Sequence, residues 1–279
     1  MVSSSMDDGR QAVARAQSWH LVQITDTHLF AEPGGKLLGL DTDLSLQRVL
    51  THVQEHDADA DLFLATGDIA QDGSLAAYQR FHALLAPLTQ RQPCLWMHGN
   101  HDLQQPLRAA VGPAAWVSPC VYQLGPWTII LLNSAVEHQV HGLFVPAQLQ
   151  FLEQALAAAG EHVLVALHHH PVAVGSRWLD QQVVENAAAF WRIIDTCRRV
   201  RAVLFGHVHQ VFEARRGAVR LLSTPSTCVQ FAVGSDAFAV SAEAPGYRWL
   251  RLFADGELES GVERVAAFHF APDFSVRGY

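Results

Sequence analysis

Short apolar runs alternate with helical patterns along most of the chain. Nine apolar runs of strand length predict β-strands at residues 19–24, 61–66, 94–98, 121–124, 127–133, 162–167, 201–205, 219–224 and 247–253. Apolar residues at helical spacing predict four helices at residues 43–56, 74–88, 146–160 and 184–200. Pro146 fits the first turn of its helix and Gly160 fits the C′ position after it. This alternation predicts an α/β fold whose strands are buried on both faces.

The pattern also bounds the folded part of the chain. We expect a disordered N-terminal tail at residues 1–17, one domain at 18–262 and a C-terminal tail at 263–279. The stretch 225–246 has the composition of a loop, and we expect a surface excursion near the functional site. The aromatic residues of 266–279 could cover a neighbouring chain in a homodimer.

Composition and charge exclude several classes of partner. The 279 residues are 49% hydrophobic and 16% charged, with a net charge of -8, so no overall basic field attracts nucleic acid. An anionic substrate would need local positive charge, which bound metal ions can supply. The four cysteines have no C-x-x-C spacing, which favours a reducing compartment over a disulfide framework. With no apolar signal segment and no run long enough to cross a bilayer, we expect a soluble, cytoplasmic protein without stable membrane insertion.

Metal-ligand residue types follow five of the predicted strands. In open α/β sheets the carboxyl ends of the strands share one edge, where ligands bind. Three of these turns place glycine directly before the candidate ligand, which permits a sharp turn and close backbone approach. The strand-end residues are Asp26, His28, Asp68, Asn100, His101, His168, His207 and His209.

Spacing and donor type indicate what these residues bind. Asp26 with His28, and His207 with His209, stand two apart, and in extended backbone each pair would share one face. The donors are carboxylates, imidazoles and one amide oxygen, without thiolate, which suits Mn, Fe or Zn better than a structural zinc site. Seven donors are too many for one ion. They fit two ions about 3.5–4 Å apart, the arrangement used for in-line displacement at phosphorus.

The ordered series D-x-H, G-D, G-N-H-D, H-H and G-H-x-H resembles the calcineurin-like metallophosphoesterases. It runs from Asp26 to His209 and so covers most of the chain. The resemblance implies a four-layer α/β/β/α sandwich of two mixed sheets with a dinuclear site between the sheet edges. Its ions would be Fe, Mn or both, with Zn or Co as alternatives.

The resemblance also implies roles for individual residues. Asp26, His28 and His209 would bind one ion, Asn100, His168 and His207 the other, and Asp68 would bridge them. A metal-bridging hydroxide would attack phosphorus in line, and His101 would protonate the leaving oxygen as general acid. On this reading the substrate contacts His28, Asp68, Asn100, His101 and His209.

The roles of several residues beside the predicted ligands stay open between two alternatives. His169 is an alternative ligand to His168, and His169 and His170 could instead support the site or face the substrate. Asp102 either orients His101 or, as we favour, caps the following helix. His98, in front of Gly99, has no assigned role.

Three further stretches, 133–142, 168–181 and 221–231, resemble bacterial class III 3′,5′-cyclic-AMP phosphodiesterases. This resemblance implies a small cyclic nucleotide as substrate, hydrolysed from 3′,5′-cyclic AMP to 5′-AMP. Trp178 would stack on the purine or fill a lid, and Arg177 would meet a phosphate oxygen or lie on the surface. His141 would line the pocket or cap a turn.

Two other functions compete with this one. A glycerophosphodiesterase or broad-specificity phosphodiesterase would use the same metals and His101 on open-chain diesters. A metal-free interaction scaffold on the same fold would be expected to lose ligand residues, and this sequence keeps every ligand type.

Overall fold

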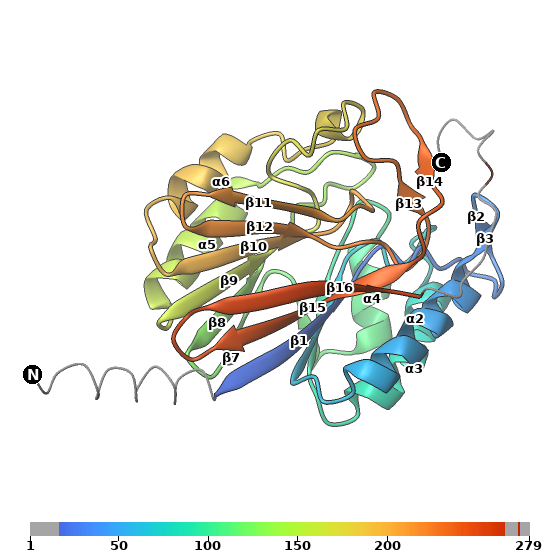
Figure 1. Ribbon diagram of the computed structural model, residues 1–279, viewed down its shortest axis with the longest axis horizontal. Coiled ribbons are helices and arrows are strands. Elements are labelled where there is room, and N and C mark those ends of the chain that lie inside the picture. The colour runs from blue at the N-terminus through green and yellow to red at the C-terminus, as the bar shows by residue number, and fades with distance from the viewer. Residues whose placement is uncertain (1–16, 266–272, 274–279) are drawn as a thin grey trace, which may run out of the picture.

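Two six-stranded mixed sheets face each other in the computed structural model, which describes residues 17–265 and residue 273 (Figure 1). The first sheet contains, in order, β16 (Leu258–Arg264), β15 (Gly246–Phe253), β1 (Ser18–Ile24), β4 (Leu62–Thr66), β5 (Cys94–Met97) and β6 (Trp116–Val117). The second contains, in order, β11 (Phe212–Arg216), β12 (Val219–Ser223), β10 (Val200–Phe205), β9 (His162–Ala166), β8 (Trp127–Leu131) and β7 (Cys120–Leu124). In the first sheet β1, β4, β5 and β6 run parallel, and in the second β8, β9, β10 and β12 do so.

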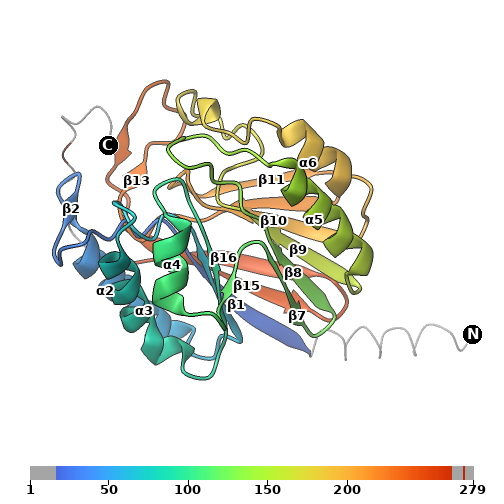
Figure 2. The same cartoon turned by 180° about the vertical axis from the view of Figure 1, so that it is seen from behind.

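Helices cover the outer face of each sheet (Figures 1 and 2). The helices on the first sheet are α2 (Thr42–His56), α3 (Leu75–Thr89) and α4 (Gln104–Val111), and those on the second are α5 (Pro146–Ala158) and α6 (Ala187–Ile194). The side chains of Asp41 and Ser74 cap α2 and α3 by accepting from backbone N–H groups three residues on. The four-layer α/β/β/α sandwich expected from the sequence is therefore confirmed.

Strand alternation divides the apolar residues among three cores. In β1, Val22 and Ile24 pack under the helices, whereas Leu21 points into the layer between the two sheets. Ile129 and Leu164 meet it there from the second sheet. The central strands are thus buried on both faces, which rigidly positions the loops that follow them.

All nine predicted strands are present. The structure differs from the prediction in the length of one helix, in additional helices and strands, and in the burial of one segment. The helix expected at 184–200 is α6, which ends at Ile194 before a turn leads into β10. Helix α4, strands β6, β11 and β16, and the two-residue strands β2 (Lys36–Leu37), β3 (Leu40–Asp41), β13 (Gln230–Phe231) and β14 (Val240–Ser241) were not anticipated. The first part of the expected surface excursion, residues 226–231, is buried rather than exposed.

The expected chain ends fall largely outside the described residues. Residues 1–16 of the N-terminal tail and, apart from residue 273, the aromatic stretch 266–279 with its expected homodimer contact are not described. Strand β16 continues to Arg264, beyond the domain end expected at 262. Among the residues that the structure does describe, no helix is long and apolar enough to span a bilayer.

Candidate active site

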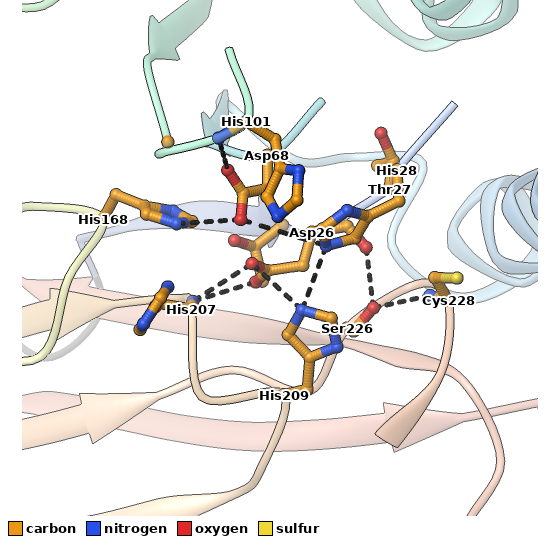
Figure 3. A network of polar contacts seen from close by, with 12 residues as sticks. Asp26, Thr27, His28, Asp68, His101, His168, His207, His209, Ser226 and Cys228 are labelled. Atoms are coloured by element: carbon orange, nitrogen blue, oxygen red, sulfur yellow. Dashed lines mark hydrogen bonds and ion pairs between the residues drawn. The ribbon is translucent and has the colours of Figure 1, made fainter. Parts of the chain in front are cut away.

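The carboxyl ends of β1, β4 and β5 meet those of β9 and β10 at one edge of the sandwich. The seven predicted ligands are brought together there: Asp26, His28, Asp68, His168, His207 and His209, which Figure 3 shows, and Asn100, whose Oδ1 lies 3.3 Å from Nε2 of His168. Six of them are buried, and Asn100 is partly buried. The two sheets contribute different members, so only their packing against each other assembles the cluster.

The backbone conformation of most ligand residues differs from the one predicted from the sequence. Asp26, His28, Asp68, His207 and His209 all have positive φ, between 47° and 68°, rather than the extended conformation assumed for the two-residue spacing. Non-glycine residues adopt this left-handed region at a cost, and such strain collects at functional sites. The D-x-H and H-x-H pairs are therefore not extended, and contacts such as the backbone hydrogen bonds from Asp26 and His28 to Gly67 and Asp68 hold their shape.

The glycine before Asn100 has a direct steric reason. A Cβ atom on Gly99 would lie 2.1 Å from Oδ1 of Asp68 and 2.4 Å from its backbone nitrogen. The loops after β4 and β5 can approach this closely only because Gly99 has no side chain.

Three side chains form the first part of the cluster. Nε2 of His28 lies 3.1 Å from Nε2 of His209, and the latter lies 3.4 Å from Oδ1 of Asp26. Nδ1 of His28 lies 2.6 Å from Oε1 of Gln71, and Nδ1 of His209 lies 2.8 Å from the Val229 carbonyl. Because both acceptors are oxygens, each Nδ1 carries the proton and each Nε2 presents a lone pair to the other.

Asp68 lies between this group and the second one. Its Oδ2 is 3.2 Å from Nε2 of His168 and 3.9 Å from Nε2 of His28. His168 donates from Nδ1 to the Thr66 carbonyl at 2.8 Å, which leaves Nε2 facing both Asp68 and Oδ1 of Asn100, at 3.3 Å. One carboxylate oxygen thus contacts members of both groups, as a bridging ligand would.

His207 and His169 complete the second group. The ligand-type atoms of His168, His169 and His207 all lie within 4.8 Å of one another. Nε2 of His207 is 3.0 Å from Oε1 of Gln182, and Nδ1 of His169 is 2.9 Å from Oγ of Ser134. Burial, with the neighbouring imidazoles, holds the pKa of both His169 and His207 well below the usual histidine value, so both rings are neutral.

The donor set fits metal ions. Lone pairs of His28 and His209 face each other, and lone pairs of His168, Asp68 and Asn100 converge, so each group needs a cation between its members. Burial lowers the pKa of His168, but the charge and hydrogen bond of Asp68 outweigh this and raise it to about 9. A proton on His168 is a cation that these residues can supply themselves, and a metal ion would replace it.

His101 lies beside the cluster and is only partly buried. Its backbone N–H donates to Oδ1 of Asp68 at 2.9 Å, and its Nδ1 is 3.2 Å from the Gln71 carbonyl. Its ring meets that of His28 edge-on, at a centroid distance of 5.0 Å. Because a carbonyl oxygen can only accept, the Gln71 contact assigns a proton to Nδ1 of His101.

Asp102 does not cap the helix that follows it. Its carboxylate accepts hydrogen bonds from the backbone N–H groups of Gly99, Ile69 and Ala70, at 2.8–3.1 Å. Helix α4 begins after Leu103 without a side-chain cap, so the capping prediction was wrong. Asp102 instead ties the loop after β4 to the loop after β5, which carries Asn100 and His101.

The residues predicted to contact the substrate outside the cluster make aromatic and surface contacts. Trp178 packs edge-on against Phe231 and Phe238, and Phe231 stacks on His209 with a centroid distance of 4.2 Å. This contact suits the lid-filling alternative for Trp178. Arg177 is exposed, and Nε2 of His141 lies 3.5 Å from the Glu185 carboxylate.

Sequence reasoning missed four supporting residues: Gln71, Ser134, Gln182 and Phe231. Each contacts a histidine of the cluster through a side chain that comes from a loop or a two-residue strand. Ordinary polar or aromatic residues in loops carry no signal in a single sequence. Gln71 stands three residues after Asp68, and Ser134 and Phe231 lie within the stretches 133–142 and 221–231, but nothing marked these residues individually.

The fold and the cluster define a metal-dependent phosphoesterase. The sequence model of calcineurin-like phosphoesterases matches residues 20–211, and the chain belongs to this family. Among similar curated proteins, the 3′,5′-cyclic adenosine monophosphate phosphodiesterase CpdA of Pseudomonas aeruginosa is 45% identical, and the alignment covers 93% of this chain and 94% of the relative. The protein of the same name from Escherichia coli K12 is 44% identical, with the same coverage of both chains. A dimetal phosphatase from Danio rerio shares the fold with a TM-score of 0.60 at 16% identity, over 89% of this chain and 99% of that one.

Proposed function

We propose that this protein hydrolyses 3′,5′-cyclic AMP to 5′-AMP with two bound metal ions. The observation that carries the proposal is the convergence of seven buried or partly buried donors, with lone pairs facing one another, at the joint edge of the two sheets. The cyclic-AMP phosphodiesterases that resemble it over more than nine-tenths of its length support the choice of substrate.

The two ions divide between the two groups of donors. Asp26, His28 and His209 would hold one, Asn100, His168 and His207 the other, and Asp68 would contact both. Nitrogen and oxygen donors without thiolate suit Mn or Fe, with Zn or Co as alternatives. Such ions would supply positive charge for the phosphate oxygens and would lower the pKa of a water molecule, which makes it an effective nucleophile.

The protein itself holds the reacting groups in line. His28, Asp68, Asn100, His101 and His209 would surround the phosphodiester. Water gives one proton to the solvent, its oxygen adds to phosphorus, and the bond from phosphorus to O3′ breaks. O3′ takes a proton from Nε2 of His101, which later regains a proton from the solvent. The Gln71 carbonyl keeps the other ring nitrogen of His101 protonated and so holds the ring in one orientation.

The loop residues have weaker roles in this proposal. Arg177 is exposed enough to meet a phosphate oxygen of an arriving substrate, and His141 would border the pocket from the loop after β8. Trp178 stays with Phe231, where it supports the face of His209.

A substrate comparison tests the proposed function. Metal-stripped protein reloaded with Mn²⁺ is given 3′,5′-cyclic AMP, glycerophosphocholine and bis(p-nitrophenyl) phosphate in parallel, and products are separated by chromatography. We expect 5′-AMP to form well ahead of any glycerol phosphate. Faster hydrolysis of glycerophosphocholine would replace the proposal with a glycerophosphodiesterase, and a protein that takes up no metal and cleaves nothing would favour an interaction scaffold.

A further inference from the structure

Two glutamine side chains contact the candidate metal cluster, one in each group of donors. Oε1 of Gln71 lies 2.6 Å from Nδ1 of His28, and Oε1 of Gln182 lies 3.0 Å from Nε2 of His207. Because an amide oxygen can only accept, each contact assigns the ring proton to the nitrogen that the glutamine faces. His28 is thereby left with Nε2 as its metal-binding atom, and His207 with Nδ1. The two glutamines thus select opposite ring nitrogens.

The other two ligand histidines have the same kind of partner on the backbone. Nδ1 of His168 lies 2.8 Å from the Thr66 carbonyl, and Nδ1 of His209 lies 2.8 Å from the Val229 carbonyl. Each proposed ion would therefore have one histidine held by a backbone carbonyl and one held by a glutamine. A backbone carbonyl is present whatever side chain the residue carries, so only the glutamine contacts depend on residue type.

The backbone of each glutamine is itself held in place. The N–H of Gln71 donates to the carbonyl of Leu29, the residue after His28, at 2.8 Å. The N–H of Gln182 donates to the Leu179 carbonyl at 2.7 Å, at the end of the short 3₁₀ helix η1 (Leu179–Gln181). Both glutamines are half-buried. A partner that is fixed in this way holds the tautomer and the orientation of the imidazole that it contacts.

The four acceptors are also uncharged, unlike the partners of a histidine elsewhere in the chain. The imidazole of His20 lies 3.0 Å from the carboxylate of Asp57 and 3.2 Å from that of Asp59. A carboxylate partner makes imidazole a more basic ligand, but it also adds a negative charge. Among the proposed ligands only Asp26 and Asp68 are carboxylates, so two divalent ions would keep net positive charge for a phosphate group. A glutamine supplies the hydrogen bond without cancelling that charge.

We propose that Gln71 and Gln182 are positioning residues, each of which holds one histidine of one ion in its metal-binding tautomer through an uncharged acceptor. The inference rests on the proposed function for the presence of two ions. It assigns Gln71 to the ion of His28 and Gln182 to the ion of His207. Loss of one acceptor weakens the binding of one ion and leaves the other ion in place.

Metal binding by chelator-treated protein tests this assignment without turnover. In equilibrium dialysis against Mn²⁺, with bound metal measured by inductively coupled plasma mass spectrometry, the wild type should bind two ions. Gln71→Leu and Gln182→Leu should each weaken one of the two binding steps by about 10–100-fold, and the double variant should weaken both. Gln181→Leu, at the exposed neighbour of Gln182, is the matched control and should bind like the wild type. Unchanged binding in both leucine variants would overturn the proposal.

Glutamate variants separate a positioning role from simple packing. Gln71→Glu and Gln182→Glu keep an oxygen acceptor of the same length but add a negative charge. We expect them to bind Mn²⁺ at least as tightly as the wild type, and to bind inorganic phosphate more weakly once loaded with Mn²⁺. Isothermal titration calorimetry measures the phosphate affinity. If the glutamate variants lose metal as the leucine variants do, the acceptor is not what matters and the proposal is wrong.

Turnover of cyclic AMP separates this inference from the proposed function. If the wild type binds two ions and cleaves cyclic AMP while the leucine variants bind metal unchanged, the role of the glutamines is wrong and the function stands. If metal binding responds to the substitutions as expected but the wild type cleaves no cyclic AMP, the function is wrong and the role of the glutamines stands.

Discussion

The Nε2 atoms of His28 and His209 lie 3.1 Å apart, although each ring already donates its Nδ1 proton to an oxygen acceptor. Two lone pairs at this distance repel each other unless a cation lies between them. Both rings are buried, so water does not compensate for the repulsion. The two ring nitrogens, with Asp26 at 3.4 Å from His209, are therefore suited to hold one cation together.

Metal ions should consequently stabilise the fold. A ligand that binds only the folded state at 100 times its Kd adds about 2.7 kcal/mol to the free energy of unfolding. We expect Mn²⁺ to raise the Tm of chelator-treated wild-type protein, and His209→Gln to lose most of this rise. His82→Gln, an exposed histidine on α3, is the matched control and should respond like the wild type. A Tm rise of the same size in His209→Gln would exclude His209 as a ligand.

Removal of the proposed acid should separate metal binding from turnover. His101→Ala should keep its metal content, measured by inductively coupled plasma mass spectrometry, and lose turnover of cyclic AMP by ~10²–10⁴. With bis(p-nitrophenyl) phosphate the loss should be much smaller, because nitrophenolate leaves without protonation. Equal losses on both substrates would show that His101 does not act as the acid.

Asp102 should matter for stability as well as for activity. In Asp102→Asn, the side-chain NH₂ would face one of the three backbone N–H groups that now donate to the carboxylate. Two donors would then face each other, and one hydrogen bond would be lost. We expect the free energy of unfolding, measured by urea titration, to fall by about 1–3 kcal/mol. Turnover should fall too, because the loop of Asn100 and His101 loses its anchor. Asp72→Asn, which removes a carboxylate that accepts from Ala31 and Ser74 at the surface, should cost less. An equal cost in both variants would argue against the anchoring role.

His20, which lies far from the cluster, should make the free energy of unfolding depend on pH. The imidazole of His20 lies between Asp57, at 3.0 Å, and Asp59, at 3.2 Å, and the hydrogen bond to Asp57 raises its pKa above the usual value despite burial. A raised pKa stabilises the folded state fully below the unfolded histidine pKa of about 6.5, and this contribution disappears as pH rises through the folded pKa. The difference in unfolding free energy between wild type and His20→Gln should thus be larger at pH 6 than at pH 9.

Urea titrations at the two pH values provide the measurement. Tyr247, which also donates to Asp57, keeps its proton at both values, because burial raises its pKa. His52→Gln controls for the histidine on α2 that lies 3.3 Å from the Tyr247 hydroxyl. A difference between wild type and His20→Gln that does not change with pH would contradict the ion-pair explanation.

The sequence by itself determined the features that depend on local chemistry. Apolar periodicity located nine strands but missed the edge strands β11 and β16, and Pro146 and Gly160 marked the ends of α5. The ligand types that follow five of the strands predicted the cluster, because parallel strands carry their carboxyl ends to one edge whatever the details of their loops.

Tertiary structure decided what depends on contacts between distant segments. The left-handed turns at Asp26, His28, His207 and His209 exist only because two packed sheets hold them, and no local preference would predict them. Asp102 ends the G-N-H-D motif in front of a helix and was expected to cap it, yet it binds backbone from the loop after β4, more than thirty residues away. Gln182 contacts His207, and Phe231 contacts His209, from segments that are distant in the sequence. Side-chain identity sets which contacts are chemically possible, and the packing of the two sheets selects among them.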